Sequence, residues 1–221
     1  MNFKYIVLSS ILLSSPALSS ISFELTGGRR QSSFDTGRDS GTHYSNESRF
    51  HVDYSLQDYL EVPVSIGLSA TGQKYDRFKG VTGLETDAIH NDLAFDLRFQ
   101  TAKLGPLSPF VNLRHTILSQ GERSFDRKVS DTGYDVKGVE EFTVKGADIT
   151  LGAKFPLFSK LEGLFAFEVG SKMINIEKTD VKEYRINLAG GPDSLEDYGK
   201  SKEGSLAYNS VAMMFGISAT L

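Results

Sequence analysis

The sequence predicts an all-β fold: an eight-stranded antiparallel up-and-down transmembrane β-barrel that spans residues 20–221. Three observations predict it. Apolar and polar side chains alternate with period two in eight segments, and period two is the side-chain repeat of a β-strand. Short and long connections alternate between these segments, as in an up-and-down barrel. After residue 20, the sequence has no window of about 18 consecutive apolar residues, which an ordinary transmembrane helix would need.

Residues 1–19 are expected to be a signal peptide that is removed after Ser19. Lys4 supplies the positive start, and the apolar stretch runs from Tyr5 to Leu13. Ala17 and Ser19 place small residues at the two positions that a signal peptidase recognises. The alternative is an uncleaved membrane anchor, but so short an apolar run cannot cross roughly 30 Å of hydrocarbon as a helix. We therefore expect export of the mature chain.

Composition excludes several classes of protein. The chain has no cysteine, so an exported fold cannot be held by disulfides. The formal net charge is -4, or -4 - 1 = -5 once Lys4 is removed, and acids and bases are mixed along the chain. No basic stripe for nucleic acid is present, so we expect no nucleic-acid partner. A mean hydropathy of -0.22 suits strands that face lipid on one side and a lumen on the other.

The C-terminal segment shows the alternation most clearly, over about 11 residues, which is the length that a tilted strand needs to cross a bilayer. Its apolar face is expected to meet lipid, and its other face is small or polar. The apolar face comprises Val211, Met213, Phe215, Ile217, Ala219 and Leu221.

Seven further segments alternate in the same way. Pro63 is acceptable in one of them because it stands at the strand start, where a missing N–H is tolerated. Aromatic residues near the strand ends are expected to form girdles at the two membrane interfaces. The segments are residues 21–26, 49–56, 62–71, 92–100, 111–117, 146–155 and 165–172, and the aromatics are Tyr54, Tyr59, Phe110, Phe155, Phe158 and Tyr208.

The connections indicate the topology. Those at residues 57–60, 101–107 and 156–162 are short. Four others are long and rich in Gly, Ser, Asp, Lys and Arg, and we expect them to be extracellular loops, with both chain ends on the periplasmic side. The four cover residues 28–47, 72–88, 119–141 and 174–205.

At this point the mature chain resembles the small eight-stranded outer-membrane barrels of the OmpA, OmpX and Opa type. Its end looks like the C-terminal signal that the barrel-assembly machinery recognises, through Gly216, Ala219 and a hydrophobic Leu221. Members of that group usually end in Phe or Trp, so Leu221 is a departure. The resemblance implies a monomer in outer-membrane lipid and a transient partnership with the assembly machinery. It carries no motif for an activity.

The polar faces carry a nearly balanced set of charges. Each would cost about 2–4 kcal/mol near the bilayer midplane, so we expect all of them inside. The interior of eight strands is about wide enough for its own side chains, which favours charges that pair and plug the lumen over a narrow polar pore. The expected lumen network is Glu24, Arg49, Asp53, Asp96, Arg98, Arg114, Asp148, Lys154, Glu168 and Lys172, with His51 and Asp92 on the same faces.

No catalytic, metal or cofactor site is expected. His115, followed by Thr116 and Ser119, invites comparison with lipid A deacylases, small barrels that place a His and a Ser on the outer surface. In that family the Ser follows the His by two positions, and here that position is Ile117. The acids of the expected loops do not match the spacing of a twelve-residue calcium loop.

The sequence thus favours a non-enzymatic outer-membrane barrel with a structural role or a surface interaction, in which the loops bind an extracellular ligand. Two alternatives stay open: a small porin-like channel for ions or polar solutes, and a lipid-modifying enzyme. A soluble lipocalin-like calyx would also have eight strands. It would place the apolar face inside, which does not suit so crowded a set of charges on the other face.

Overall fold

The computed structural model describes residues 21–35, 40–60, 63–79, 85–129, 134–185, 194–197 and 204–221. The signal peptide predicted for residues 1–19 lies outside these ranges and stays a prediction. No helix of the described part is long and apolar enough to cross a membrane. The elements are β1 (Ile21–Asp35), β2 (Ser40–Ser55), α2 (Gln57–Leu60), β3 (Val64–Lys79), β4 (Glu85–Gln100), β5 (Ser108–Val129), β6 (Tyr134–Phe158), β7 (Leu161–Arg185), β8 (Ser194–Asp197) and β9 (Gly204–Thr220).

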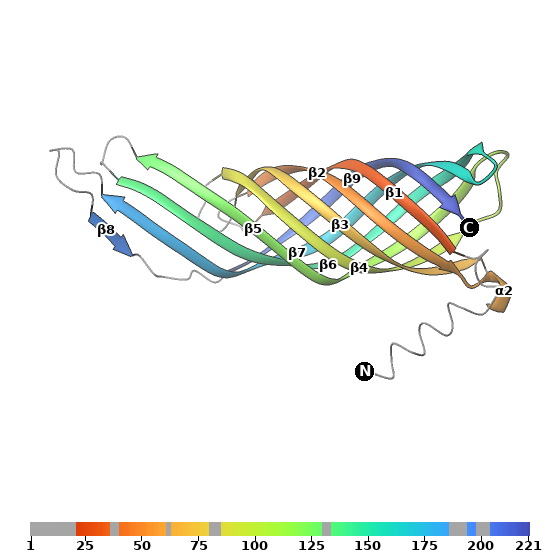
Figure 1. Cartoon of the computed structure of the whole chain (residues 1–221), viewed down its shortest axis with the longest axis horizontal. Coiled ribbons are helices and arrows are strands. Elements are labelled where there is room, and N and C mark those ends of the chain that lie inside the picture. Colours follow the sequence, from red (N-terminus) through yellow and green to blue (C-terminus); the bar gives the residue numbers. More distant parts are fainter. Residues whose placement is uncertain are drawn as a thin grey trace.

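Eight of the strands close into an antiparallel barrel, as predicted (Figure 1). β1 to β7 each pair with the next strand in the chain, and β9 pairs with both β7 and β1. The pairing of β6 with β7 completes the ring, so the barrel wall has no free edge. β8 is a short extra strand that pairs with β7 alone, through Lys182 and Asp197 at one end and Arg185 and Ser194 at the other.

The first and last strands meet at one end of the barrel, here called the terminal end, where Ser22 pairs with Thr220. The short connections lie at the same end (Figure 1). One holds α2, and another turns at Gly105, whose φ of +62° lies in the left-handed region that favours glycine. Pro63 stands just before β3, and its carbonyl accepts a hydrogen bond from the Gln100 N–H at 2.8 Å. The proline therefore removes no donor from the interior of the ladder.

The four long loops predicted from the sequence are mostly strand. β1 and β2 pair out to Asp35 and Ser40, and β5 and β6 pair out to Val129 and Tyr134. The prediction of loops over residues 28–47, 72–88 and 119–141 is therefore wrong for most of their length, and residues 36–39, 80–84 and 130–133 lie outside the described residues. Within 174–205, β7 continues to Arg185 and β8 adds a further strand.

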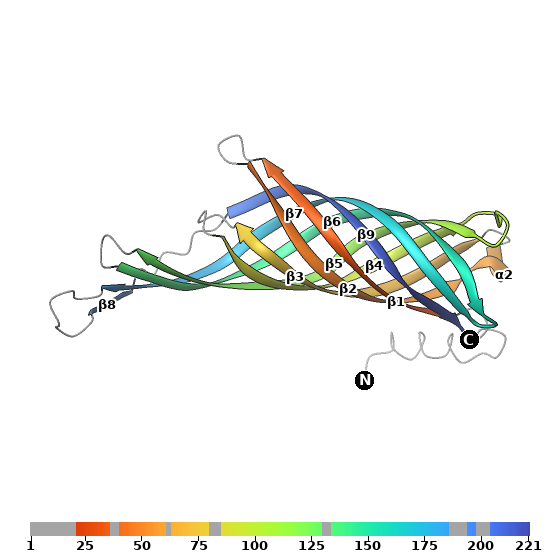
Figure 2. The same ribbon diagram turned by 90° about the horizontal axis from the view of Figure 1, so that it is seen from above.

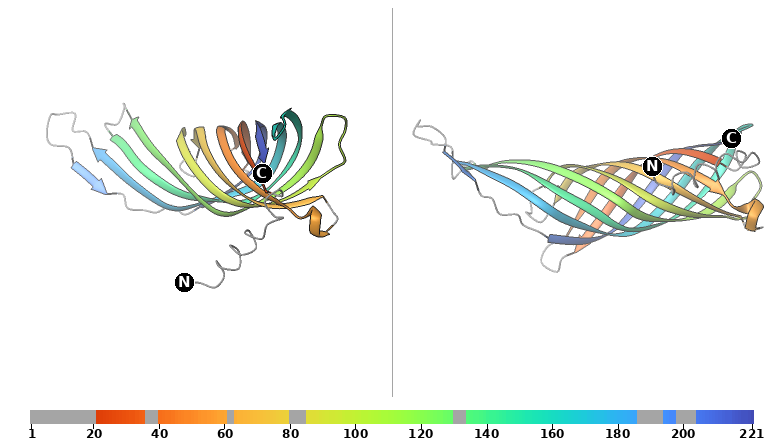
Figure 3. Two further views of the ribbon diagram at one scale, coloured as in Figure 1. Left: turned by 45° about the vertical axis from the view of Figure 1, so that its right-hand side comes forward. Right: turned by 60° about the horizontal axis from the view of Figure 1, so that its bottom comes forward.

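The strands differ in length, so the distal end, opposite the terminal end, is not level. β1 to β4 have 15 or 16 residues, whereas β5 has 22 and β6 and β7 have 25 each. The distal parts of β5, β6 and β7, with β8 at the edge, form one projecting sheet that we call the flap (Figures 2 and 3).

The polarity of the wall is inverted relative to a water-soluble barrel. Outward side chains near the terminal end form an apolar belt, and the inward side chains beside them are mostly polar or charged. Above the belt, towards the distal end, the outward positions turn polar, as at Lys74 and Asn209. The belt comprises Leu25, Phe50, Ile66, Leu68, Phe95, Phe99, Leu113, Ile117, Leu118, Ile149, Leu151, Phe165, Phe167, Val169, Val211, Met213, Phe215 and Ile217, all exposed.

Two apolar clusters lie inside the lumen at different heights. The lower cluster, near the terminal end, comprises Phe110, Leu164, Ala166 and Met214. The upper cluster comprises Tyr75, Ala88, Phe142, Val144, Ile174, Leu206 and Tyr208. The predicted interfacial girdle is therefore wrong for Phe110 and Tyr208, which are 3% and 4% exposed and point inward. Tyr59 and Phe158 are exposed at the terminal end, where a girdle residue belongs.

The belt predicts the effect of a charge on the lipid-facing side. Phe215→Arg should lower the free energy of unfolding by about 2–4 kcal/mol, because the guanidinium would sit in hydrocarbon. Denaturant titration of the refolded barrel in lipid vesicles, followed by heat-dependent gel mobility, measures this change. Asn209→Arg is the matched control, since it faces outward on the same strand but above the belt. Equal stability of the two variants would contradict the assignment of faces.

Candidate functional site: the charged lumen

Buried charged side chains occupy the lumen from the level of the lower apolar cluster to that of the upper one. Among the described residues they are seven acids and seven bases, so the formal charge of the set is balanced. All ten residues of the network expected from the sequence lie in it. The acids are Glu24, Glu47, Asp53, Asp92, Asp96, Asp148 and Glu168, and the bases are Arg30, Arg49, Arg98, Arg114, Arg123, Lys154 and Lys172.

A lower ionic group is built around Arg98 of β4. Its guanidinium donates to both oxygens of Glu24, with Nη2 2.7 Å from Oε2, and to Asp53 Oδ2 at 2.6 Å. Lys154 Nζ lies 2.6 Å from Glu24 Oε1, and His51 Nε2 lies 3.2 Å from Asp53 Oδ1. The flat face of the guanidinium stacks on the Phe110 ring at 4.5 Å. Side chains from several strands are thereby tied together across the lumen.

An upper ionic group is built around Arg30 of β1, which is fully buried. Arg30 Nε donates to Glu47 Oε2 at 2.8 Å, Nη1 donates to Ser210 Oγ at 2.7 Å, and Nη2 donates to Glu168. Arg49 holds the other side of Glu168, with Nη1 2.8 Å from Oε2 and Nη2 3.0 Å from Oε1. Glu168 thus lies between two guanidinium groups, which compensate its burial.

Asp148 of β6 is the acidic counterpart of Arg30. Its carboxylate lies 3.1 Å from Arg114 Nη1, 2.9 Å from Lys172 Nζ and 3.4 Å from Arg30 Nη1. The space it occupies exists because β7 carries Gly170 beside it, where a Cβ would come within 1.9 Å of Asp148 Oδ1. A glycine at that point of the wall is a requirement of the charge network.

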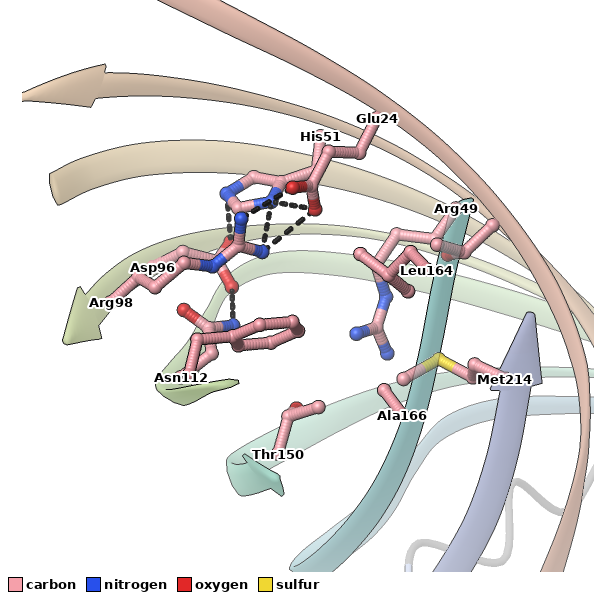
Figure 4. A pocket seen from close by; sticks show the side chains of 12 residues that line it. Glu24, Arg49, His51, Asp96, Arg98, Asn112, Thr150, Leu164, Ala166 and Met214 are labelled. Carbon is pink, nitrogen blue, oxygen red and sulfur yellow. Dashed lines mark hydrogen bonds and ion pairs between the residues drawn. The ribbon is translucent and has the colours of Figure 1, made fainter. Parts of the chain in front are cut away.

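The two groups meet around Asp96, beside a small cavity (Figure 4). Asp96 accepts hydrogen bonds from Ser69 Oγ at 2.5 Å and Asn112 Nδ2 at 2.7 Å, and His51 lies at 3.8 Å. The cavity measures about 20 Å³, which is room for about one water molecule. Asn112 Oδ1 and Arg49 Nε beside it have no hydrogen-bond partner among the described residues. These are the kind of groups that a buried water satisfies.

Glu24, His51 and Asp53 have ligand atoms within 4.8 Å of one another, which is close enough for a metal ion. The chemistry of the surroundings does not fit one. Arg98 donates to Glu24 and to Asp53, and Lys154 contacts Glu24 as well. A divalent cation would have to displace two resident positive charges, so these carboxylates are already neutralised by the protein.

Sequence reasoning missed Arg30, Glu47 and Arg123, because all three fall in stretches assigned to loops; Arg30 and Glu47 belong to the upper group. The period-two alternation of the strand faces could have indicated Arg30 and Glu47. The period-two face of Glu24 and Thr26 continues through Arg30, and the face of Arg49 and Asp53 extends back through Glu47. The alternation of hydrophobicity fades there because the outward neighbours, such as Arg29, are polar as well.

His115 faces outward, as predicted, but Ser119 does not lie near it. Ser119 Oγ lies 2.9 Å from His90 Nε2, whose Nδ1 lies 3.2 Å from Gln73 Oε1. This geometry is superficially that of a nucleophile, a base and an orienting group. Two facts oppose catalysis. The Ser119 oxygen also accepts the Val144 N–H at 2.6 Å, and the His90 side chain is fully buried, so a substrate cannot reach it from outside the wall.

Ser119 has a structural task instead. The register between β5 and β6 jumps from His115 to Gly121, and an extra residue at Ile117 turns both Ile117 and Leu118 outward. The Ser119 hydroxyl spans this break by accepting the Val144 N–H of β6. A buried N–H without a partner is destabilising, so the side chain replaces a missing ladder bond.

The expected assembly signal lies on β9 at the terminal end. Gly216 packs against β1 so closely that a Cβ would come within 2.2 Å of the Leu25 carbonyl oxygen. Leu221 is exposed, and its N–H donates to the Ile21 carbonyl at 3.1 Å. Ala219 pairs with Phe23 on one side and Leu161 on the other. These contacts account for Gly216 in the fold, and recognition by the assembly machinery stays a prediction.

A closed ring of eight antiparallel strands, an apolar outer belt and a charged, filled lumen occur together. The chain is a small eight-stranded barrel of the outer-membrane kind. No family model and no curated protein matches its sequence.

Solved structures resemble the barrel at low identity. Neisserial surface protein A is 12% identical over 90% of this chain and 97% of that one, with a TM-score of 0.43. A major outer membrane protein from Thermus thermophilus is 12% identical over 91% and 99%, with a TM-score of 0.49. The outer membrane protease OmpT from Escherichia coli is 8% identical over 92% and 97%, with a TM-score of 0.45. The fold of this chain is fixed by its own strand pairing.

The charge network predicts that two adjacent arginines, Arg29 and Arg30, contribute very different amounts to the free energy of unfolding. Arg30→Ala should lower the free energy of unfolding by about 3–5 kcal/mol, because it leaves Glu47 and Glu168 buried with less compensation. Arg29→Ala, on the outer face, should lose about 0.5–1 kcal/mol, the worth of an exposed stacking contact such as that with Tyr44. Urea titration in lipid vesicles measures both. Similar losses for the two would show that the lumen pairs add little.

The strand break predicts the role of Ser119. Ser119→Ala should lower the free energy of unfolding by about 1–3 kcal/mol, because the Val144 N–H loses its partner. Ser171→Ala, outward on β7, is the control and should change it by less than about 0.5 kcal/mol. Hydrolysis of a p-nitrophenyl ester is measured alongside. Unchanged stability together with loss of a wild-type esterase activity would make Ser119 a nucleophile instead.

Proposed function

We propose that this protein is a non-enzymatic integral outer-membrane barrel with a closed lumen, whose role is structural or lies in surface interaction. The observation that carries the proposal is the filling of the lumen. Two ionic groups centred on Arg98 and Arg30 occupy the lumen. The Arg98 group packs against the lower apolar cluster and the Arg30 group lies between the two clusters, so charge pairs and packed apolar side chains fill the lumen together.

This filling favours a plug over a pore. A conducting pore needs a continuous path of water, whereas the cavity found between the two ionic groups has room for about one molecule. The lumen charges are also engaged with one another: Glu24, Asp148 and Glu168 each contact at least two cations. A passing ion would have to break such pairs, and breaking a buried pair costs about 3–5 kcal/mol.

The membrane location rests on the apolar belt. A belt of exposed Leu, Ile, Val, Met and Phe side chains around a closed ladder suits hydrocarbon, in which every backbone polar group must be satisfied internally. We propose that a cleaved leader directs the chain through export, that the barrel-assembly machinery inserts it as a monomer, and that the terminal end faces the periplasm.

Surface interaction is assigned to the distal end. There the strands continue beyond the belt, and the flap of β5 to β8 stands highest. A sheet that projects from a membrane carries its surface away from the lipid, which suits contact with an extracellular ligand. Folds of this kind host many functions, so the identity of that ligand has to come from the distal surface and not from the barrel.

Planar-bilayer recording tests the closed lumen. The refolded mature protein, with insertion verified by heat-dependent gel mobility, should show no discrete current steps, because the ionic groups and both apolar clusters fill the axis. Arg30→Ala is recorded in parallel, since it removes the central cation of the upper group. Reproducible openings of the wild type would replace the plug with the alternative of a small channel for ions or polar solutes.

A further inference from the structure

The outer wall of the barrel carries a polar pocket just above the apolar belt. Outward-facing residues of β3, β4 and β5, together with Gly121, line it, and it is an open depression of about 570 Å³. We call it the outer-wall pocket. Its lining is Lys74, Asp87, Ile89, Asn91, Gln120, Gly121, Glu122 and Ser124.

Strand register sets the arrangement of the pocket. Ile89 stands at its centre on β4, with Lys74 of β3 opposite on one side and Glu122 of β5 opposite on the other. One step nearer the belt, Asn91 pairs with Gln120, so two amide side chains lie next to each other. Asp87 lies one step nearer the distal end, and its Oδ2 is 3.9 Å from Lys74 Nζ.

The charges of the pocket select against anions. It holds one base, Lys74, and two acids, Asp87 and Glu122, so its formal charge is -1. Lys74 and Asp87 are 63% and 69% exposed, so their contact is a weak surface pair that leaves both groups available. A phosphate or sulfate group would meet a net repulsion here. An uncharged ligand would not.

The donors and acceptors suit hydroxyl groups. Asn91 and Gln120 each offer an amide donor and an amide acceptor, Asp87 and Glu122 accept, and Lys74 donates. A sugar ring carries hydroxyls that both donate and accept, around a less polar face of C–H groups. Ile89, 58% exposed in the middle of this polar ring, supplies an apolar surface for that face.

We propose that the outer-wall pocket binds an uncharged sugar ring, presented at the level where the headgroups of the outer leaflet begin. The ring would lie over Ile89 with its hydroxyls bonded to Asn91, Gln120 and Glu122. The proposal rests on the membrane placement given under Proposed function, since that placement decides what surrounds the pocket.

Two sources could supply the same sugar chemistry: a saccharide linked to a lipid of the same leaflet, or a free saccharide. The wall below the pocket suits a lipid. The break in β5 turns Ile117 and Leu118 outward together, 52% and 64% exposed, directly beneath Gln120. An acyl chain attached to a bound sugar would run over these two residues into the belt.

A tryptophan reporter makes the site measurable, because the chain has no tryptophan of its own. Ser124→Trp places an indole at the distal edge of the pocket and leaves Ile89 and the amides in place. The protein is held in lauryldimethylamine oxide micelles, and dodecyl maltoside, free maltose and dodecylphosphocholine are titrated separately. The fluorescence maximum of the indole is recorded at constant total detergent.

Dodecyl maltoside should shift the emission with saturation. Adding Asn91→Ala and Gln120→Ala should raise the half-saturating concentration about tenfold or more, because two hydrogen-bonding amides are lost. Asn209→Ala is the matched control on β9, four strands away across the barrel, and should leave the response unchanged. A saturable response to free maltose would also support the site and identify the sugar alone as sufficient.

The proposal is overturned by three results: no saturable response to either sugar, an equal response to dodecylphosphocholine, or a response that the double amide variant retains in full. Heat-dependent gel mobility of every variant shows whether the barrel is folded. A folded, non-conducting barrel without a sugar response would contradict the proposed sugar site alone. A barrel that fails to insert into vesicles would contradict the proposed membrane function.

Discussion

The lack of hydrogen-bonding partners in hydrocarbon is the constraint on which this structure depends. Every N–H and C=O of the wall must find a partner within the chain, which a closed antiparallel ladder provides. The closed ring in turn gives each strand a lipid side and a lumen side, so the apolar and charged side chains separate with period two. Where the ladder breaks between β5 and β6, the Ser119 hydroxyl takes over as the acceptor for Val144.

A lumen filled with charged side chains is stable only if acids and bases neutralise one another. Arg30 and Asp148 each contact several partners of opposite sign, and glycine at 170 leaves the space that the Asp148 carboxylate needs. Removal of one member therefore leaves others buried without compensation. The side of the wall on which a charged residue stands decides how much it contributes to stability. Arg29 and Arg30 are neighbours in β1, but only Arg30 points into the lumen and compensates buried acids.

The sequence allowed the fold class, the strand order and the sides of the wall to be predicted, because hydrophobicity alternates strongly inside the belt. Prediction failed where that contrast ends. Beyond the belt both faces of a strand are polar, so strand and loop look alike, and Arg30 and Glu47 were missed. The extra residue at Ile117 shifts the phase of β5, which depends on strand register and three-dimensional packing. The inward direction of Phe110 and Tyr208 follows the period-two alternation of their own strands, which the expected girdle did not take into account.

Because the strands differ in length, the rim of the barrel at the distal end is slanted and not level. β1 to β4 end low and β5 to β7 end high, so the molecule presents a short side and a tall side to its surroundings. A broad, stiff body that approached the distal end would meet the tall side first, whereas a small molecule could pass it and reach the outer wall of the short side.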